Sequence, residues 1–151
     1  MFSLAKKIVP LLLVIVGCCV GYLAYEGHVL DKSSKAYVDE AIPAIVTSWL
    51  PHELLKRESS AFLKATSDAQ LMQLFVDFRR IGALQSYEGC KGEANIKYTL
   101  ASGKMITAAY SGQAIFQNGK AEIKVLLIQQ NGEWKIQGFR IESPLFMKIV
   151  L

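Results

Sequence analysis

The chain has 151 residues, enough for one modest domain, and its net charge of +4 comes without the arginine and aromatic clusters of a nucleic-acid-binding surface. Hydrophobic residues make up 52% of it, more than a soluble domain normally carries, and much of the excess lies before residue 31. The composition therefore predicts a membrane segment followed by one globular domain, with no nucleic-acid partner.

The first predicted element is an apolar segment, residues 8–25, whose 18 residues include no charged side chain. A helix rises 1.5 Å per residue, so this length just crosses a hydrocarbon core of about 30 Å. Lys6 and Lys7 precede the segment, whereas Glu26 and Asp31 follow it. The positive-inside rule then places the N-terminus in the cytoplasm and the rest of the chain outside.

This assignment predicts a cytoplasmic tip and transmembrane anchor over residues 1–29, and an extracytoplasmic domain over residues 30–151. Two cleaved alternatives remain open. The sequence Ile-Val-Gly-Cys at 15–18 resembles a lipoprotein signal box, in which Cys18 would be freed and acylated, and ordinary signal cleavage is the other alternative. The residues after Cys18 stay apolar, whereas a lipoprotein continues into a polar tether, so the uncleaved anchor is favoured.

Helical spacing of apolar residues predicts three helices after the anchor. The first covers residues 33–50, with a kink or break expected at Pro43 because proline removes a backbone hydrogen bond. The second is short and covers residues 51–63, starting at a proline. The third covers residues 67–81, and Gly82 follows it as a C-cap. The first is amphipathic and the third carries one apolar stripe, and the inner face of the sheet should pack against the helices.

Three turn signals divide the remaining chain into four strands. They are Ala-Ser-Gly at 101–103, Asn-Gly at 118–119 and Asn-Gly at 131–132, and Asn-Gly is the strongest short hairpin signal. The strands are expected over residues 84–100, 104–117, 120–130 and 133–143, as an antiparallel meander. The loops imply three opposed pairs: Tyr98 with Ile106, Phe116 with Ala121, and Gln129 with Trp134.

This register predicts the shape of the sheet and the character of its two faces. Gly112, Val125 and Gly138 would lie side by side, which predicts a sharply curved sheet with a hollow on its inner face. The outer face would carry more apolar surface than a monomer leaves in water, so we expect a second copy or an envelope protein to cover it. The residues expected at this interface are Ile115, Leu126, Ile128, Phe139 and Ile141.

This architecture resembles a known superfamily over residues 33–143. Kinked helices followed by a strongly curved four-stranded meander look like the cystatin-like α+β folds of the nuclear transport factor 2-like superfamily. The stretches GALQSYEGCKGEA at 82–94 and GEWKIQGF at 132–139 are similar to membrane-anchored bacterial proteins of that superfamily. The resemblance implies a cone-like α+β domain and a place in the bacterial inner membrane. The superfamily includes enzymes, ligand carriers and assembly subunits, so the resemblance does not decide function.

Enzymes of this superfamily place an acid-base residue inside the cone, and the resemblance directs attention to polar residues on the predicted inner face. The candidate ligand-binding residues are Tyr98, Tyr110, Arg140 and Glu142. Arg140 could bind an anionic group, but pairing with Glu142 or Asp77 is favoured because buried charges are usually paired. The two tyrosines are more often core residues with a bonded hydroxyl than a catalytic pair.

No motif in the sequence points to catalysis, a metal or a cofactor. His28 and His52 have no second ligand at metal spacing, and no phosphate loop, dinucleotide fingerprint or nucleophile elbow occurs. We therefore expect a membrane-tethered, non-enzymatic binding or assembly module of the cell envelope. Two alternatives stay open: a subunit of a secretion or envelope complex, and a small-ligand carrier, isomerase or dehydratase that uses the cone.

Overall fold

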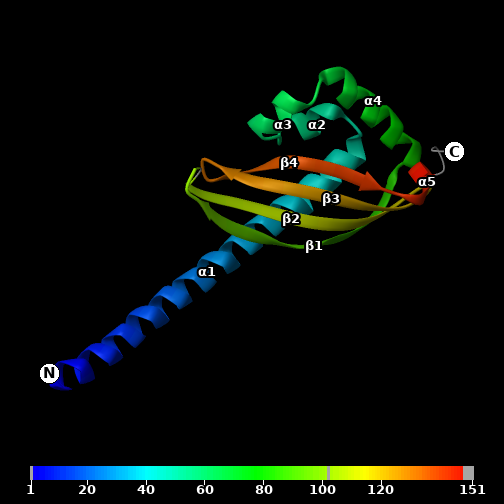
Figure 1. Ribbon diagram of the computed structural model, residues 1–151. Coiled ribbons are helices and arrows are strands. Elements are labelled where there is room, and N and C mark those ends of the chain that lie inside the picture. Colours follow the sequence, from blue (N-terminus) through cyan, green and yellow to red (C-terminus); the bar gives the residue numbers. More distant parts are fainter. Residues whose placement is uncertain (1, 102, 148–151) are drawn as a thin grey trace.

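The computed structural model describes residues 2–101 and 103–147, except for the side chains of 2–8, 11 and 147, and confirms an α+β fold with a long N-terminal helix (Figure 1). Five α-helices, a short 3-10 helix and four strands follow one another along the described chain. Their bounds are α1 Phe2–Ser48, α2 Pro51–Leu55, α3 Ser60–Ala65, α4 Asp68–Phe78, η1 Arg79–Ile81, β1 Leu84–Thr99, β2 Gly103–Phe116, β3 Gly119–Gln130, β4 Glu133–Glu142 and α5 Pro144–Met147.

Helix α1 joins the apolar segment to the core without interruption. Its apolar part projects free of the domain, whereas its C-terminal part lies against the sheet (Figure 1). Of the kink or break expected at Pro43, the break is wrong, since the helix continues to Ser48, and the kink stays a prediction. Val38, Ile42 and Ile45 are fully buried around that proline. Burial of this apolar face stabilises the helix more than the one lost hydrogen bond weakens it.

Helix α1 is also the one described helix that is long and apolar enough to cross a membrane. The stretch from Leu12 to Ser48 contains an 18-residue window with a mean hydropathy of 1.6, and none of that window is buried in the domain. By length and composition this helix fits a transmembrane or signal anchor.

The helix predicted over residues 51–63 is two helices, α2 and α3, separated by a short extended segment. In that segment Ser59 N donates to Ile136 O at 2.8 Å, and Ile136 N donates to Arg57 O at 2.7 Å. These bonds satisfy backbone groups on the exposed edge of β4, as edge strands require. The helix is interrupted because its backbone completes the sheet instead.

Helix α4 begins as its sequence predicts. Ser67 caps it in a capping box with Gln70, and Leu71, Phe75 and Phe78 form its buried stripe. η1 continues the helix to Ile81, and Gly82 then takes a φ of +87°, which a residue with a side chain rarely adopts.

The sheet is an antiparallel meander in the order β1-β2-β3-β4, which confirms the predicted topology. The pairing differs in two hairpins, where Ile96 lies opposite Ile106 and Phe116 lies opposite Gly119. Each difference moves the partner by two residues. Side chains alternate with a period of two, so both shifts leave the inner and outer faces unchanged.

The β3–β4 hairpin contains the one register shift that changes which face of the sheet the side chains occupy. Its turn has positive φ at Asn131 and Gly132, as predicted, and Leu127 lies opposite Ile136. A bulge at Gln137 then adds one residue to β4, so that Leu126 lies opposite Gly138. A one-residue insertion reverses the direction of every side chain beyond it.

This bulge overturns several face assignments. Ile141 lies opposite Ile123 and is 7% exposed, so it belongs to the core, and Phe139 lies opposite Val125 on the same inner face. Arg140 and Glu142 instead face outward. The predicted row of Gly112, Val125 and Gly138 does not form, because Gly112 lies opposite Ile123 and Gly138 opposite Leu126.

Candidate functional site

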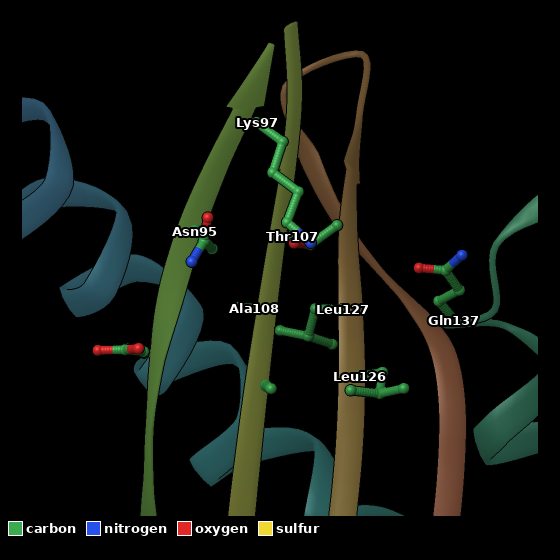
Figure 2. A pocket seen from close by; sticks show the side chains of 9 residues that line it. Asn95, Lys97, Thr107, Ala108, Leu126, Leu127 and Gln137 are labelled. Atoms are coloured by element: carbon green, nitrogen blue, oxygen red, sulfur yellow. The ribbon is translucent and has the colours of Figure 1, made fainter. Parts of the chain in front are cut away.

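A groove of about 360 Å³ lies on the outer face of the sheet, the face turned away from α1 (Figure 2). All four strands contribute to it. Figure 2 shows Asn95 on β1, Thr107 on β2, Leu126 on β3 and Gln137 on β4 around the same hollow. The full lining consists of Glu93, Asn95, Lys97, Thr107, Ala108, Ala109, Leu126, Leu127 and Gln137.

Strand register explains why these residues meet. Glu93 lies opposite Ala109, Ala109 opposite Leu126, and Leu126 opposite Gly138, so one row crosses the whole sheet. Ala109 and Gly138 are the small residues of this row, so the larger side chain of Leu126 projects above them. Leu126 is 52% exposed, and its side chain leans over Gly138. The result is a groove with the projecting apolar side chain of Leu126 beside it.

The groove offers polar groups of several kinds around an apolar floor formed by alanine and leucine side chains. Asn95 and Gln137 supply amides, Thr107 supplies a hydroxyl, and Glu93 and Lys97 supply opposite charges on the same strand. Such groups donate and accept hydrogen bonds with an extended backbone or a polar ligand.

The rest of the outer face carries charges that pair with one another. Lys124 contacts Glu142 at 2.8 Å and Glu122 at 3.9 Å, and Arg140 contacts Glu142 at 3.1 Å. Ser111 donates a hydrogen bond to Glu122. The side chain of Arg140 is largely exposed, so this ladder lies in solvent. Such exposed pairs contribute little stability and leave the surface hydrophilic.

The four predicted ligand-binding residues do not form one site. Tyr110 is buried against α1, where its hydroxyl lies 2.9 Å from the Ser34 hydroxyl. Tyr98 is exposed near the end of the β1–β2 hairpin, and Arg140 and Glu142 lie on the opposite face of the sheet from Tyr110. Arg140 pairs with Glu142 on the outer face and not in the predicted inner-face hollow, because the bulge at Gln137 reverses the direction of both side chains.

The predicted interface residues divide in the same way. Ile115, Leu126 and Ile128 lie on the outer face, so their place at an interface stays a prediction. Phe139 and Ile141 face the core and cannot be part of that surface. The apolar patch is therefore smaller than the sequence predicted, and it centres on the groove.

Two titratable sites were not predicted from the sequence: a cluster around Asp39 and a single carboxylic acid. In the first, the Tyr87 hydroxyl donates to Asp39 at 2.9 Å, Lys35 pairs with Asp39, and the buried Cys90 lies beside them. Burial and the Asp39 carboxylate raise the pKa of Cys90 to about 11. The thiol is therefore protonated at neutral pH and a poor nucleophile. This cluster is a polar contact between α1 and β1.

The second is Glu58, a carboxylic acid in the segment between α2 and α3. Its side chain is buried, and Oε1 has no hydrogen-bond partner. Burial raises its pKa to about 7. The sequence signal that could have identified Glu58 is its position directly before Ser59, where the chain reaches the edge of β4.

Two further predictions concern Cys18 and metal binding. Cys18 is exposed on the apolar part of α1, which is compatible with either an uncleaved anchor or an acylated thiol. Within residues 2–101 and 103–147 no three His, Cys, Asp or Glu side chains come together as metal ligands.

Comparisons with known protein families, with curated proteins and with solved structures find no match. The resemblance to the nuclear transport factor 2-like superfamily therefore stays a prediction.

Proposed function

We propose that the chain is a non-enzymatic, membrane-tethered binding module of a bacterial cell envelope. The anchor crosses the inner membrane at residues 8–25, the N-terminus is cytoplasmic, and the domain outside binds a protein partner through the outer-face groove. The observation that carries this proposal is the change of surroundings along α1, which is exposed in its apolar part and fully buried at Val38 and Ile42.

The exposed part of α1 needs an apolar environment. Its exposed side chains include Leu13, Val14 and Val16, and the first charged residue after them is Glu26. Removing one such aliphatic side chain from water is favourable by about 1.5–3 kcal/mol of free energy. A bilayer provides that environment along the whole length of the segment, and Lys6 and Lys7 favour a cytoplasmic N-terminus.

The packing of the inner face supports a binding role over an enzymatic one. An enzyme or carrier of the resembled superfamily uses the space inside the cone. Here Ile42 of α1 approaches Gly112 so closely that an added Cβ would lie 2.9 Å from Ile42 Cδ1, and Tyr110 is bonded to Ser34. The groove at Leu126 lies on the other face. A subunit of a secretion or envelope complex would be one form of this binding role.

Membrane attachment is tested on the full chain by fractionation, extraction with alkaline carbonate, and protease treatment of spheroplasts. We expect the chain to resist extraction and the domain to be digested from outside. Leu13→Lys together with Val16→Lys should release it, because each charge in the middle of a span costs about 2.5–3.5 kcal/mol. Lys32→Gln, outside the segment, is the matched control. Extraction of the unaltered chain by carbonate would contradict the anchor.

The intact mass separates the anchor from its lipoprotein alternative. An uncleaved chain retains the whole 16.7 kDa, whereas signal cleavage before Cys18 removes 17 residues and adds acyl chains. We expect the uncleaved mass, with Cys18→Ser leaving membrane attachment unchanged. A smaller, acylated species that Cys18→Ser abolishes would replace the span with a lipid tether.

The binding surface is tested by a photo-crosslinking amino acid placed at Leu126 in living cells, with Lys120 as the exposed control on the same strand. We expect a defined adduct from position 126 and none from position 120. An adduct of twice the chain's mass would identify a second copy as the partner, and another mass would identify an envelope protein. Equal labelling from both positions, or none, would contradict a partner at the groove.

A further inference from the structure

We propose that the β1–β2 hairpin makes a second contact with the membrane, in which Leu100 and Tyr98 enter the headgroup layer beside α1. The partner of this surface is the lipid bilayer itself. The inference rests on the proposed anchor and deepens it, because it gives the domain two points of attachment to one membrane.

Contacts between the hairpin and α1 place the turn near the apolar segment. Asp31 Oδ1 accepts a hydrogen bond from Ala94 N at 2.6 Å, and farther along the hairpin the Lys104 ammonium pairs with the Glu26 carboxylate. Glu26 is the first residue after the apolar segment. The hairpin therefore meets α1 just after the apolar segment, and Figure 1 shows its turn at the end of the sheet from which α1 leaves the domain.

The turn reaches beyond this ion pair. Lys104 lies opposite Tyr98, and Leu100 follows two residues later at the turn, about 7 Å farther along an extended strand. The headgroup layer on each side of the hydrocarbon core is roughly 5–8 Å thick. A side chain at the turn is therefore within reach of that layer when the anchor is inserted.

The side chains at this turn suit a lipid interface. Leu100 is 111% exposed, as much as in an extended peptide, and Tyr98 is 68% exposed. Tyr22 and Tyr25 are also exposed at the end of the apolar segment of α1. Tyrosines gather at membrane interfaces because the ring is apolar and the hydroxyl stays hydrated. Lys97, exposed on the strand before the turn, adds a positive charge that lipid phosphates attract.

The turn at the opposite end of the sheet has a different character. Gln117 and Asn118 form the β2–β3 turn, and Asn118 donates hydrogen bonds to Ile81 O and Arg80 O. That polar turn is tied to the domain. The exposed apolar turn is the one beside the anchor, which is where a contact with the same bilayer can form.

The experiment uses the full chain in vesicles of phosphatidylcholine and phosphatidylglycerol, with or without acyl chains brominated near their carbonyl ends. Bromine quenches tryptophan fluorescence at short range, so Leu100→Trp reports contact with lipid. Lys120→Trp, at the far end of the sheet, is the matched control, and the unaltered chain gives the background from Trp49 and Trp134. Flotation of the same samples and their resistance to alkaline carbonate report insertion of α1.

We expect Leu100→Trp to show a blue-shifted emission and a loss of intensity in brominated vesicles, whereas Lys120→Trp and the unaltered chain show neither. Vesicles that float with inserted chain but leave Leu100→Trp unquenched would overturn the hairpin contact alone. A chain that does not float, or that carbonate removes, would overturn the anchor and the hairpin contact together. Quenching of Leu100→Trp and Lys120→Trp alike would also overturn the contact, since it would mean that lipid reaches the whole domain.

Discussion

The hydroxyl oxygens of Ser34 on α1 and Tyr110 on β2 lie 2.9 Å apart in the core, 76 residues apart in the chain. Ser34 also donates to Leu30 O, and the Tyr110 hydroxyl is 3.1 Å from Asp31 O. One side-chain pair therefore connects the helix that leaves the domain to the middle of the sheet.

Removing one hydroxyl of this pair should weaken the connection. We expect Tyr110→Phe to lower the free energy of unfolding by about 1–2 kcal/mol, because buried oxygens lose their partner. Chemical denaturation of the full chain in detergent micelles measures the change. Tyr98→Phe alters an exposed ring and is the control. Equal stability of the two variants would show that the buried pair contributes nothing.

The bulge at Gln137 predicts opposite sensitivities for neighbouring residues of β4. Ile141→Ala should lower the free energy of unfolding by about 2–4 kcal/mol, since it empties core space. Arg140→Ala removes an exposed charge and should cost less than about 0.5 kcal/mol. Denaturation midpoints of the two variants measure the difference. The reverse order would mean that β4 follows its turn without a bulge.

Glu58 predicts a pH-dependent stability. Its pKa is raised from a usual 4.5 to about 7 in the folded chain, so the folded state holds the proton more tightly than the unfolded state does. Stability is therefore highest below pH 4.5 as far as this group is concerned, falls as the pH rises towards 7, and stays low above 7. The expected change is at most roughly 3 kcal/mol. Glu58→Gln should remove this dependence in denaturation curves.

A control at an exposed carboxylate separates Glu58 from the general effect of charge. The Glu133 side chain is largely exposed, and Glu133→Gln should leave the pH dependence in place. A Glu58→Gln variant with the pH profile of the unaltered chain would show that the buried carboxylate is not the group responsible.

Gly92 and Gly138 provide a matched pair of glycine substitutions in strands. A Cβ at position 92 would lie 2.0 Å from the Ala109 carbonyl oxygen, whereas at position 138 the nearest atom would be Leu126 Cδ1 at 3.4 Å. We expect Gly92→Ala to cost about 3 kcal/mol by forcing β1 and β2 apart. Gly138→Ala should change stability by less than about 0.5 kcal/mol. Thermal unfolding of both variants measures this, and comparable melting temperatures would contradict the close approach at Gly92.

The order of elements and most inner-face positions could be predicted because they depend on local signals. The Asn131-Gly132 turn adopts the positive φ angles that its residues favour. In the β2–β3 hairpin the pairing moved by two residues, because backbone groups at Ile81 and Ala83 hold the turn. An even shift preserves the faces, so Tyr110 and Ile123 stayed where the alternating pattern placed them.

The candidate site was harder to predict because it depends on one unpaired residue. A register inferred from a turn is obtained by counting residues from the loop, so it misses an insertion farther along the strand. The bulge at Gln137 therefore reversed the expected faces of Phe139 and Arg140. A signal was present, since Gly138 stands beside the bulge and strand glycines often mark one. The division between α2 and α3 has a long-range cause, the bonds from Arg57 and Ser59 to β4.

The uninterrupted α1 has a consequence for how a partner would meet this protein. In the proposed arrangement the orientation of the domain follows that of the span, because α1 continues as one helix from the apolar segment to Val38. In the proposed arrangement Lys97, at one edge of the groove, lies three residues or about 10 Å from the turn at Leu100. A partner diffusing in the same bilayer would then encounter the groove at constant height, and two-dimensional confinement would raise its effective concentration.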